Sequence, residues 1–153
     1  MFIRALLAFL ALPGTVGFLA PPLLGQLDPW RGAPTVWGWP LWLLGFFILL
    51  SCVRDFYVAG KGTLAPWRPP KQLVTVGLYR YCRNPMYVGV VTLVLGWAWL
   101  LSSPVVALYA VAISLIFHGR VLLHEEPWLR REFSDSWPLY ARQVPRWWPR
   151  WPR

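Results

Sequence analysis

Apolar residues along this chain gather into four runs that short polar or basic segments separate. The runs cover residues 2–24, 36–53, 86–101 and 105–123. The second run holds 18 residues without a charge, which is about the minimum for crossing a bilayer core roughly 30 Å thick. We therefore expect an all-α integral membrane protein, a bundle of about four transmembrane helices.

The first run differs from the others because prolines and glycines interrupt it, so we expect a helix that is kinked or shorter than a full span. A secretory signal peptide is the alternative, with Arg4 as its charged region and residues 5–12 as its apolar core. Cleavage after Ala20 would leave Pro21 at the first mature position, which is a poor site, so we favour a retained helix. The interrupting residues are Pro13, Gly14, Gly17, Pro21 and Pro22.

Two later segments predict further features. Ser102, Ser103 and Pro104 join the last two runs, which predicts a tight antiparallel helical hairpin with the proline at a helix start. Farther on, apolar residues at helical spacing predict an amphipathic cytoplasmic segment that lies on the membrane surface or caps the bundle. Residues 145–153 are too rich in proline for a helix. The spaced apolar residues are Leu129, Phe133, Trp137 and Tyr140.

Composition and charge support the membrane interpretation. The chain is 57% hydrophobic and 14% charged, whereas a soluble domain carries about 25% charged residues. Of the 15 Lys and Arg residues behind the net charge of +9, 13 lie in residues 54–83 and 120–153, each directly after an apolar run. This distribution favours positive-inside flanks over nucleic-acid binding. We expect the active site and both termini in the cytoplasm, at the inner membrane if the source is bacterial.

Tryptophans agree with this orientation. They cluster at the helix ends opposite the basic stretches, where an interfacial aromatic belt is expected. These residues are Trp30, Trp37, Trp39, Trp97 and Trp99.

Glu125 and Glu126 are the first candidates for chemistry, because a carboxylate at a membrane boundary is costly unless it faces a polar cavity or a partner. His118 lies seven residues earlier and so on roughly the same helical face. A helix end with solvated charges is the alternative. Pro127 should end or kink the helix there.

A second candidate cluster surrounds Arg83, Asn84 and Pro85 at the entrance to the third helix. Backbone N–H groups at a helix start, with an arginine beside them, suit a carboxylate or phosphate. Arg80 and Arg83 could equally be topological anchors. Cys52 and Cys82 have no metal-ligand spacing, so we expect two reduced thiols and no metal site.

These two clusters carry a resemblance to a known family. Residues 73–89 resemble the G-x-Y-x-x-x-R-H-P-x-Y-x-G signature of isoprenylcysteine carboxyl methyltransferases, which related membrane phospholipid methyltransferases share. The second half resembles that family's E-E-x-x-L-x-x-x-F-G-x-x-Y-x-x-Y-x-x-x-V-P-R ending. The residues that match it are Glu125, Glu126, Leu129, Phe133, Tyr140, Val144, Pro145 and Arg146.

The resemblance implies S-adenosylmethionine as methyl donor, reached from the cytosol, and a lipophilic acceptor from the bilayer. We expect Arg83, Glu125 and Glu126 to be catalytic, and Arg120 and His118 to contact the acceptor. The residues that the resemblance assigns to the cofactor are Lys71, Gln72, Leu73, Val74, Gly77, Tyr79, Arg83, Asn84, Pro85, Tyr87 and Glu125.

The chain departs from the family pattern at three positions. Asn84 stands where the family often has His, Ser134 replaces a Gly, and Trp137 replaces a Tyr. Asn84 can donate and accept hydrogen bonds but cannot titrate.

Residues 1–153 thus form one predicted domain, with two N-terminal helices in 1–53 and a cofactor-binding region in 71–149. The expected activity is that of an isoprenylcysteine carboxyl O-methyltransferase. The alternatives are a phospholipid N-methyltransferase, an NADPH-dependent intramembrane reductase of the sterol reductase type, or a non-catalytic scaffold. Expected partners are the acceptor and membrane lipids, with no nucleic acid; the oligomeric state stays open.

Overall fold

The computed structural model describes residues 10–59 and 72–149, and every regular element within those stretches is a helix. The all-α prediction is therefore confirmed. The elements in chain order are η1 (Leu10–Leu19), α2 (Ala20–Leu27), η2 (Val36–Gly38), α3 (Trp39–Ala59), η3 (Gly77–Arg80), α4 (Pro85–Leu100), α5 (Pro104–Arg120), η4 (Val121–Glu125), α6 (Glu126–Glu132) and α7 (Trp137–Gln143).

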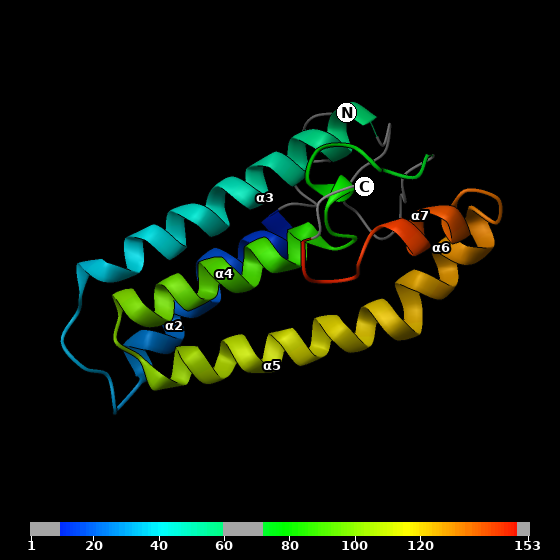
Figure 1. Ribbon diagram of the computed structural model, residues 1–153. Coiled ribbons are helices and arrows are strands. Elements are labelled where there is room, and N and C mark those ends of the chain that lie inside the picture. The colour runs from blue at the N-terminus through cyan, green and yellow to red at the C-terminus, as the bar shows by residue number, and fades with distance from the viewer. Residues whose placement is uncertain (1–9, 60–71, 150–153) are drawn as a thin grey trace.

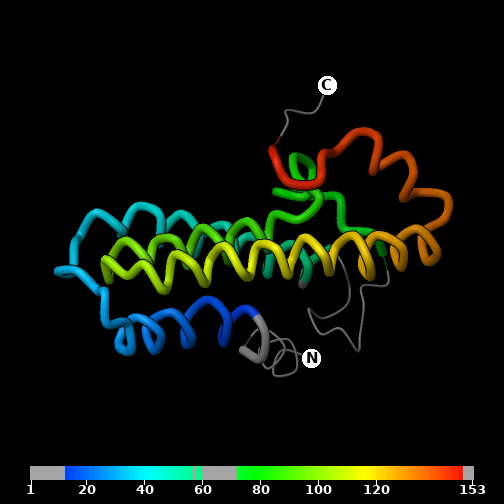
Figure 2. The backbone as a smooth tube through the Cα atoms, turned by 90° about the horizontal axis from the view of Figure 1, so that it is seen from below, coloured from blue at the N-terminus to red at the C-terminus, as the bar shows by residue number. Residues whose placement is uncertain are grey.

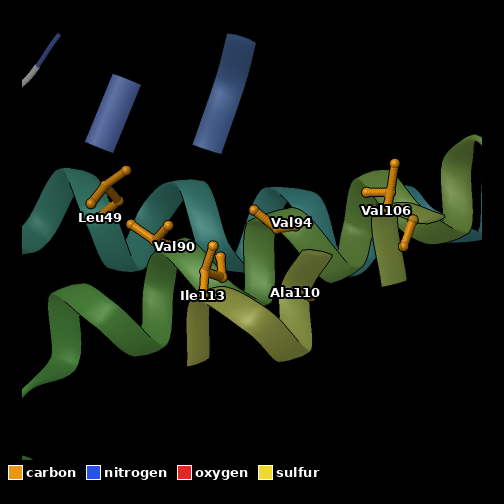
Figure 3. Close-up of a cluster of buried hydrophobic side chains, with 7 residues drawn as sticks. Leu49, Val90, Val94, Val106, Ala110 and Ile113 are labelled. Carbon is orange, nitrogen blue, oxygen red and sulfur yellow. The ribbon is translucent and has the colours of Figure 1, made fainter. Parts of the chain in front are cut away.

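Helices α2 to α5 lie side by side, and each runs opposite to the next along the chain (Figure 1, Figure 2). Helix α4 packs against α2, α3 and α5. A cluster of buried side chains from α3, α4 and α5 forms the core, and Figure 3 shows how they meet. Its buried members are Leu49, Val90, Val94, Ala98, Val106, Ala110 and Ile113.

Close contact of η2 and α3 with α4 depends on glycine. A Cβ added to Gly96 would lie 2.5 Å from the backbone N of Trp42, and one added to Gly38 would lie 2.5 Å from the carbonyl O of Gly96. A Cβ added to Gly45 would have equally little room, because it would lie against the backbone of Leu93. Small residues allow such close backbone approach between membrane helices, where van der Waals packing drives association.

The predicted hairpin is present, since α4 ends at Leu100 and α5 begins at Pro104. Ser103 caps α5 by accepting a hydrogen bond from the N–H of Val106 at 3.2 Å, and its hydroxyl donates to the buried carboxylate of Asp28. Asp28 also accepts from the N–H groups of Trp30 and Val105, at 2.8 and 3.1 Å. One carboxylate thus ties the loop after α2 to the hairpin turn.

Two helices among the described residues are long and apolar enough to cross a membrane, Val36–Phe56 and Pro104–Glu132, and most of each apolar window faces outward. Pro85–Leu100 is apolar but shorter. The first predicted run is helical from Leu10 onward, first as the π-helix η1 with Pro13 inside it and then as α2. Residues 2–9 of that run lie outside the described residues. The count of four spans stays a prediction.

The helix continues past Pro127 instead of ending there. The π-helical turn η4 precedes the proline, and the chain then continues as α6 at an angle to α5 (Figure 1). A π turn accommodates the missing N–H of a proline by shifting the hydrogen-bond register.

The predicted amphipathic segment forms two short helices, because residues 133–136 make a turn between α6 and α7. Trp137, Tyr140 and Val144 are buried together, and Leu73, Leu129 and Phe133 pack against them. The apolar residues therefore gather on one side without belonging to one helix. Whether this unit touches the membrane stays a prediction.

Candidate functional site

The two sequence clusters meet at the end of the bundle where α4 begins and α5 ends (Figure 1). Arg83 precedes α4, Glu126 begins α6, and the segment 144–149, which we name the C-terminal strap, lies against both. The site therefore joins residues from three separate parts of the chain.

Glu126 is shared by two arginines. It accepts hydrogen bonds from Arg83 Nη1 at 2.9 Å, from Arg146 Nε at 2.7 Å and from Arg146 Nη2 at 2.8 Å. Hydrogen bonds between ionised groups are roughly twice as strong as neutral ones, and the forked pairing also fixes direction. The Arg83 guanidinium additionally lies 5.7 Å from the centre of the Trp137 ring, within range of a cation–π contact.

Burial lowers the pKa of the Arg83 guanidinium from its ordinary value, although the Glu126 carboxylate opposes this shift. The hydrogen bond from Arg146 to Glu126 raises the pKa of Arg146. Both side chains stay cationic at neutral pH, because the ordinary arginine pKa lies far above 7.

Hydrogen-bond donors without a partner lie beside this ion pair. Among the described residues, Arg83 Nε is buried and has no hydrogen-bond partner. The Asn84 side chain does not cap α4, since its amide donates to the carbonyl O of Arg146 at 3.1 Å. The first N–H groups of a helix have no partner within the helix, so this corner offers donors that suit a carboxylate.

Glu125 has different partners from those of Glu126. The hydroxyl of Tyr87 and Nε of Arg120, the latter at 2.8 Å, both donate to its Oε1. The Tyr87 ring stacks on Phe117 with centroids 4.4 Å apart. Two adjacent glutamates thus belong to two neighbouring networks, one on the strap and one facing α4 and α5.

His118 pairs with the strap. Its Nδ1 accepts a hydrogen bond from the indole N–H of Trp147 at 3.1 Å, and the two rings are tilted with centroids 5.9 Å apart. Of the two residues predicted to contact the acceptor, Arg120 therefore belongs to the Glu125 network, while His118 accepts a hydrogen bond from Trp147.

The predicted cofactor residues before α4 lie in several environments. Val74 and Tyr79 are buried in a cluster with Cys52, and Leu73 packs against Trp137 and its neighbours, whereas Gln72 is exposed. Lys71 lies outside the described residues. The cofactor-binding role of this segment stays a prediction.

Gly77 makes the turn in that segment possible. It has a φ of +57°, in the left-handed region that favours glycine. An added Cβ would also collide with the carboxylate of Asp55.

Arg146 and Trp147 also lie in this cluster, where they contact Glu126 and His118, and the sequence assigned no role to either of them. The Val-Pro-Arg ending was part of the motif, but nothing in its pattern indicated which carboxylate the arginine pairs with. No group of three or more His, Cys, Asp or Glu side chains within residues 10–59 and 72–149 could hold a metal ion. The arrangement instead suits binding and positioning of an anionic group.

Comparison with known proteins gives three findings. A family model described as phospholipid methyltransferase matches residues 34–136. The chain is 37% identical over 73 residues to protein-S-isoprenylcysteine O-methyltransferase of Schizosaccharomyces pombe, covering 48% of this chain and 31% of that protein. It is 30% identical over 74 residues to protein-S-isoprenylcysteine O-methyltransferase B of Arabidopsis thaliana, covering 48% and 38%. Each match thus spans less than two fifths of the relative's length. No solved structure matches the chain.

Proposed function

The chain belongs to the phospholipid methyltransferase family, and from this we propose that it is a membrane enzyme that transfers a methyl group from S-adenosylmethionine to a lipophilic acceptor. The names of both relatives favour an isoprenylcysteine carboxylate as acceptor. The family description supports a phospholipid amine as the second candidate. The observation that carries the proposal is the ionic cluster at which the two family-like motifs meet, with Arg83 Nε left free.

The residues at this corner fit the amino-acid end of the cofactor. A carboxylate would accept from Arg83 Nε, which has no partner in the described part of the chain, and from the N–H groups that follow Pro85 in the first turn of α4, which the Asn84 side chain does not cap. The rest of the pocket is proposed to consist of Lys71, Gln72, Leu73, Val74, Gly77, Tyr79, Asn84, Pro85 and Tyr87.

When bound, the cofactor supplies an electrophilic methyl group on a sulfonium, which is already a good leaving group. The protein's own residues then mainly position the reactants and exclude water. Glu125, held by Tyr87 and Arg120, would orient the acceptor or the cofactor's polar groups. A carboxylate acceptor needs no general base, whereas an amine acceptor would release a proton to Glu125 or His118.

Titration calorimetry on the purified protein in detergent tests the cofactor. S-adenosylmethionine and S-adenosylhomocysteine should bind, and NADPH should not. Binding of NADPH alone would favour the reductase alternative, and binding of none of the three would favour a non-catalytic scaffold. Transfer of labelled methyl groups to N-acetyl-S-farnesylcysteine or to phosphatidylethanolamine vesicles then distinguishes the two acceptor classes.

Replacement of Glu125 tests its role. The Glu125→Gln variant should bind S-adenosylhomocysteine more weakly or lose most of its turnover, because the amide cannot carry the charge that Arg120 and Tyr87 orient. Glu132→Gln, exposed at the end of α6, is the matched control. A Glu125→Gln variant with full turnover and full cofactor affinity would remove Glu125 from the scheme.

We also propose that this end of the bundle faces the cytoplasm. Basic residues gather near the start of α4 and the end of α5. At the opposite end of the bundle lie Trp37 in η2, Trp39 at the start of α3 and Trp99 near the end of α4. A C-terminal green fluorescent protein fusion should fluoresce, and a C-terminal alkaline phosphatase fusion should be inactive. The reverse pattern would place the site on the other side.

A further inference from the structure

The C-terminal strap is attached to the start of α4 through its own backbone. The carbonyl O of Pro145 accepts from the backbone N–H of Arg83 at 2.9 Å, and that of Arg146 accepts from the Asn84 side chain at 3.1 Å. The Cys82 thiol lies 3.4 Å from the Arg146 carbonyl O and 3.2 Å from that of Trp147. These contacts set the Arg146 side chain directly beside Glu126.

The Arg146 guanidinium occupies both oxygens of Glu126 in a forked pair, at 2.7 and 2.8 Å. A fork of this kind fixes the plane of a carboxylate, which a single hydrogen bond does not. The orientation of Glu126 therefore depends on a residue 20 positions farther along the chain.

Glu126 in turn determines how Arg83 is held. The side chain of Arg83 is only 13% exposed, its Nη1 donates to Glu126, and its guanidinium packs near the Trp137 ring. These contacts leave Nε buried without a partner in the described structure. An unsatisfied buried donor is costly, and a ligand acceptor would remove that cost.

We propose that Arg146 is a positioning residue for the cofactor site: by fixing Glu126 it holds Arg83 with Nε free to donate to the carboxylate of the bound cofactor. The inference rests on the proposed function for the identity of that ligand. It assigns to the strap a specific role in recognising the amino-acid end of the cofactor and none in recognising the nucleoside.

Two ligands separate this role from a general structural one. S-adenosylhomocysteine carries the carboxylate, and 5′-methylthioadenosine is the same nucleoside thioether without the amino-acid end. The Arg146→Ala variant should bind S-adenosylhomocysteine roughly 10- to 100-fold more weakly, the loss expected for one charge-assisted hydrogen bond. Its affinity for 5′-methylthioadenosine should stay within about twofold of wild type, since that ligand has no group for Arg83 to bind.

Two further variants sharpen the test. Arg146→Lys keeps the charge but not the fork, so its affinity for S-adenosylhomocysteine should fall between those of wild type and Arg146→Ala. Arg142→Ala removes an exposed arginine of α7 that makes no hydrogen bond or ion pair with the described residues, and it should bind both ligands as wild type does.

The outcomes are distinguishable. Equal losses of affinity for both ligands in Arg146→Ala would mean that the strap supports the whole pocket. Unchanged binding of both would mean that Arg83 does not depend on Arg146. Either result would overturn this inference and leave the proposed function standing. A wild-type protein that binds neither ligand would overturn the proposed function and this inference with it.

Discussion

Replacing Glu126 by alanine removes the carboxylate that Arg83 and Arg146 share and leaves two cations facing each other. Three charge-assisted hydrogen bonds are lost. Removing one partner of a buried ion pair costs about 3–5 kcal/mol. Because the Arg146 side chain is 32% exposed and water screens its charge, we expect the lower end, about 3 kcal/mol. That free energy should appear mainly as easier opening of the C-terminal strap.

Cys82 reports this opening. Burial raises the pKa of its thiol, and the S–H group donates to strap carbonyls, so the closed state should react slowly with N-ethylmaleimide. The background variant is Cys52→Ser, which leaves Cys82 as the reactive thiol. Since about 1.4 kcal/mol is a factor of ten, 3 kcal/mol should raise the opening equilibrium and the alkylation rate roughly 100-fold.

The matched control is Glu132→Ala, which removes an exposed glutamate of the same helix. Its alkylation rate should stay within about twofold of the Cys52→Ser parent, as expected for a surface substitution. If Glu126→Ala also reacted within a few-fold of the parent, the shared ion pair would not be what holds the strap.

Two further predictions concern packing and capping, with thermal unfolding in detergent as the measurement. Gly96→Ala should lower the free energy of unfolding by about 2 kcal/mol, because its Cβ would overlap the Trp42 backbone. The control Gly119→Ala, with no neighbour within 4 Å, should be neutral or stabilising. Equal effects of the two substitutions would contradict the close-packing argument. Ser103→Ala should cost about 1–2 kcal/mol, because it removes the N-cap of α5 and the hydrogen bond that the hydroxyl donates to Asp28. Ser136→Ala, at the α7 N-cap without a side-chain bond, should change little. A reversed order would refute this assignment.

Much of the fold follows from local patterns. The last two apolar runs and the Ser-Ser-Pro turn predict α4 and α5 to within one residue at the turn, because Pro104 suits a helix start. The second run underestimates α3, which continues through Arg54 and Asp55 to Ala59. A charged residue ends an apolar run but does not end a helix, since Arg and Asp still adopt helical backbone angles.

Other features were predicted only in part. The apolar spacing from Leu129 to Tyr140 is helical, but residues 133–136 make a turn between α6 and α7, and apolar residues of both helices pack together with Leu73. Pro127 was expected to end or kink the helix; the helix does not end there, and it changes direction after the register shift in η4. Helical spacing by itself does not specify where a turn divides the segment, or which of the two expected outcomes a proline produces.

By itself the sequence determined the helical class, the membrane character, the family and the two clusters that are proposed to carry chemistry, because apolar runs and short motifs are properties of neighbouring residues. Only the tertiary structure decided how those clusters pair. Glu125 and Glu126 are adjacent and chemically identical, yet one contacts Tyr87 and the other contacts Arg83 and Arg146. The reason is physical: ion pairs between residues 20 and 43 positions apart form only where the folded backbone brings them together.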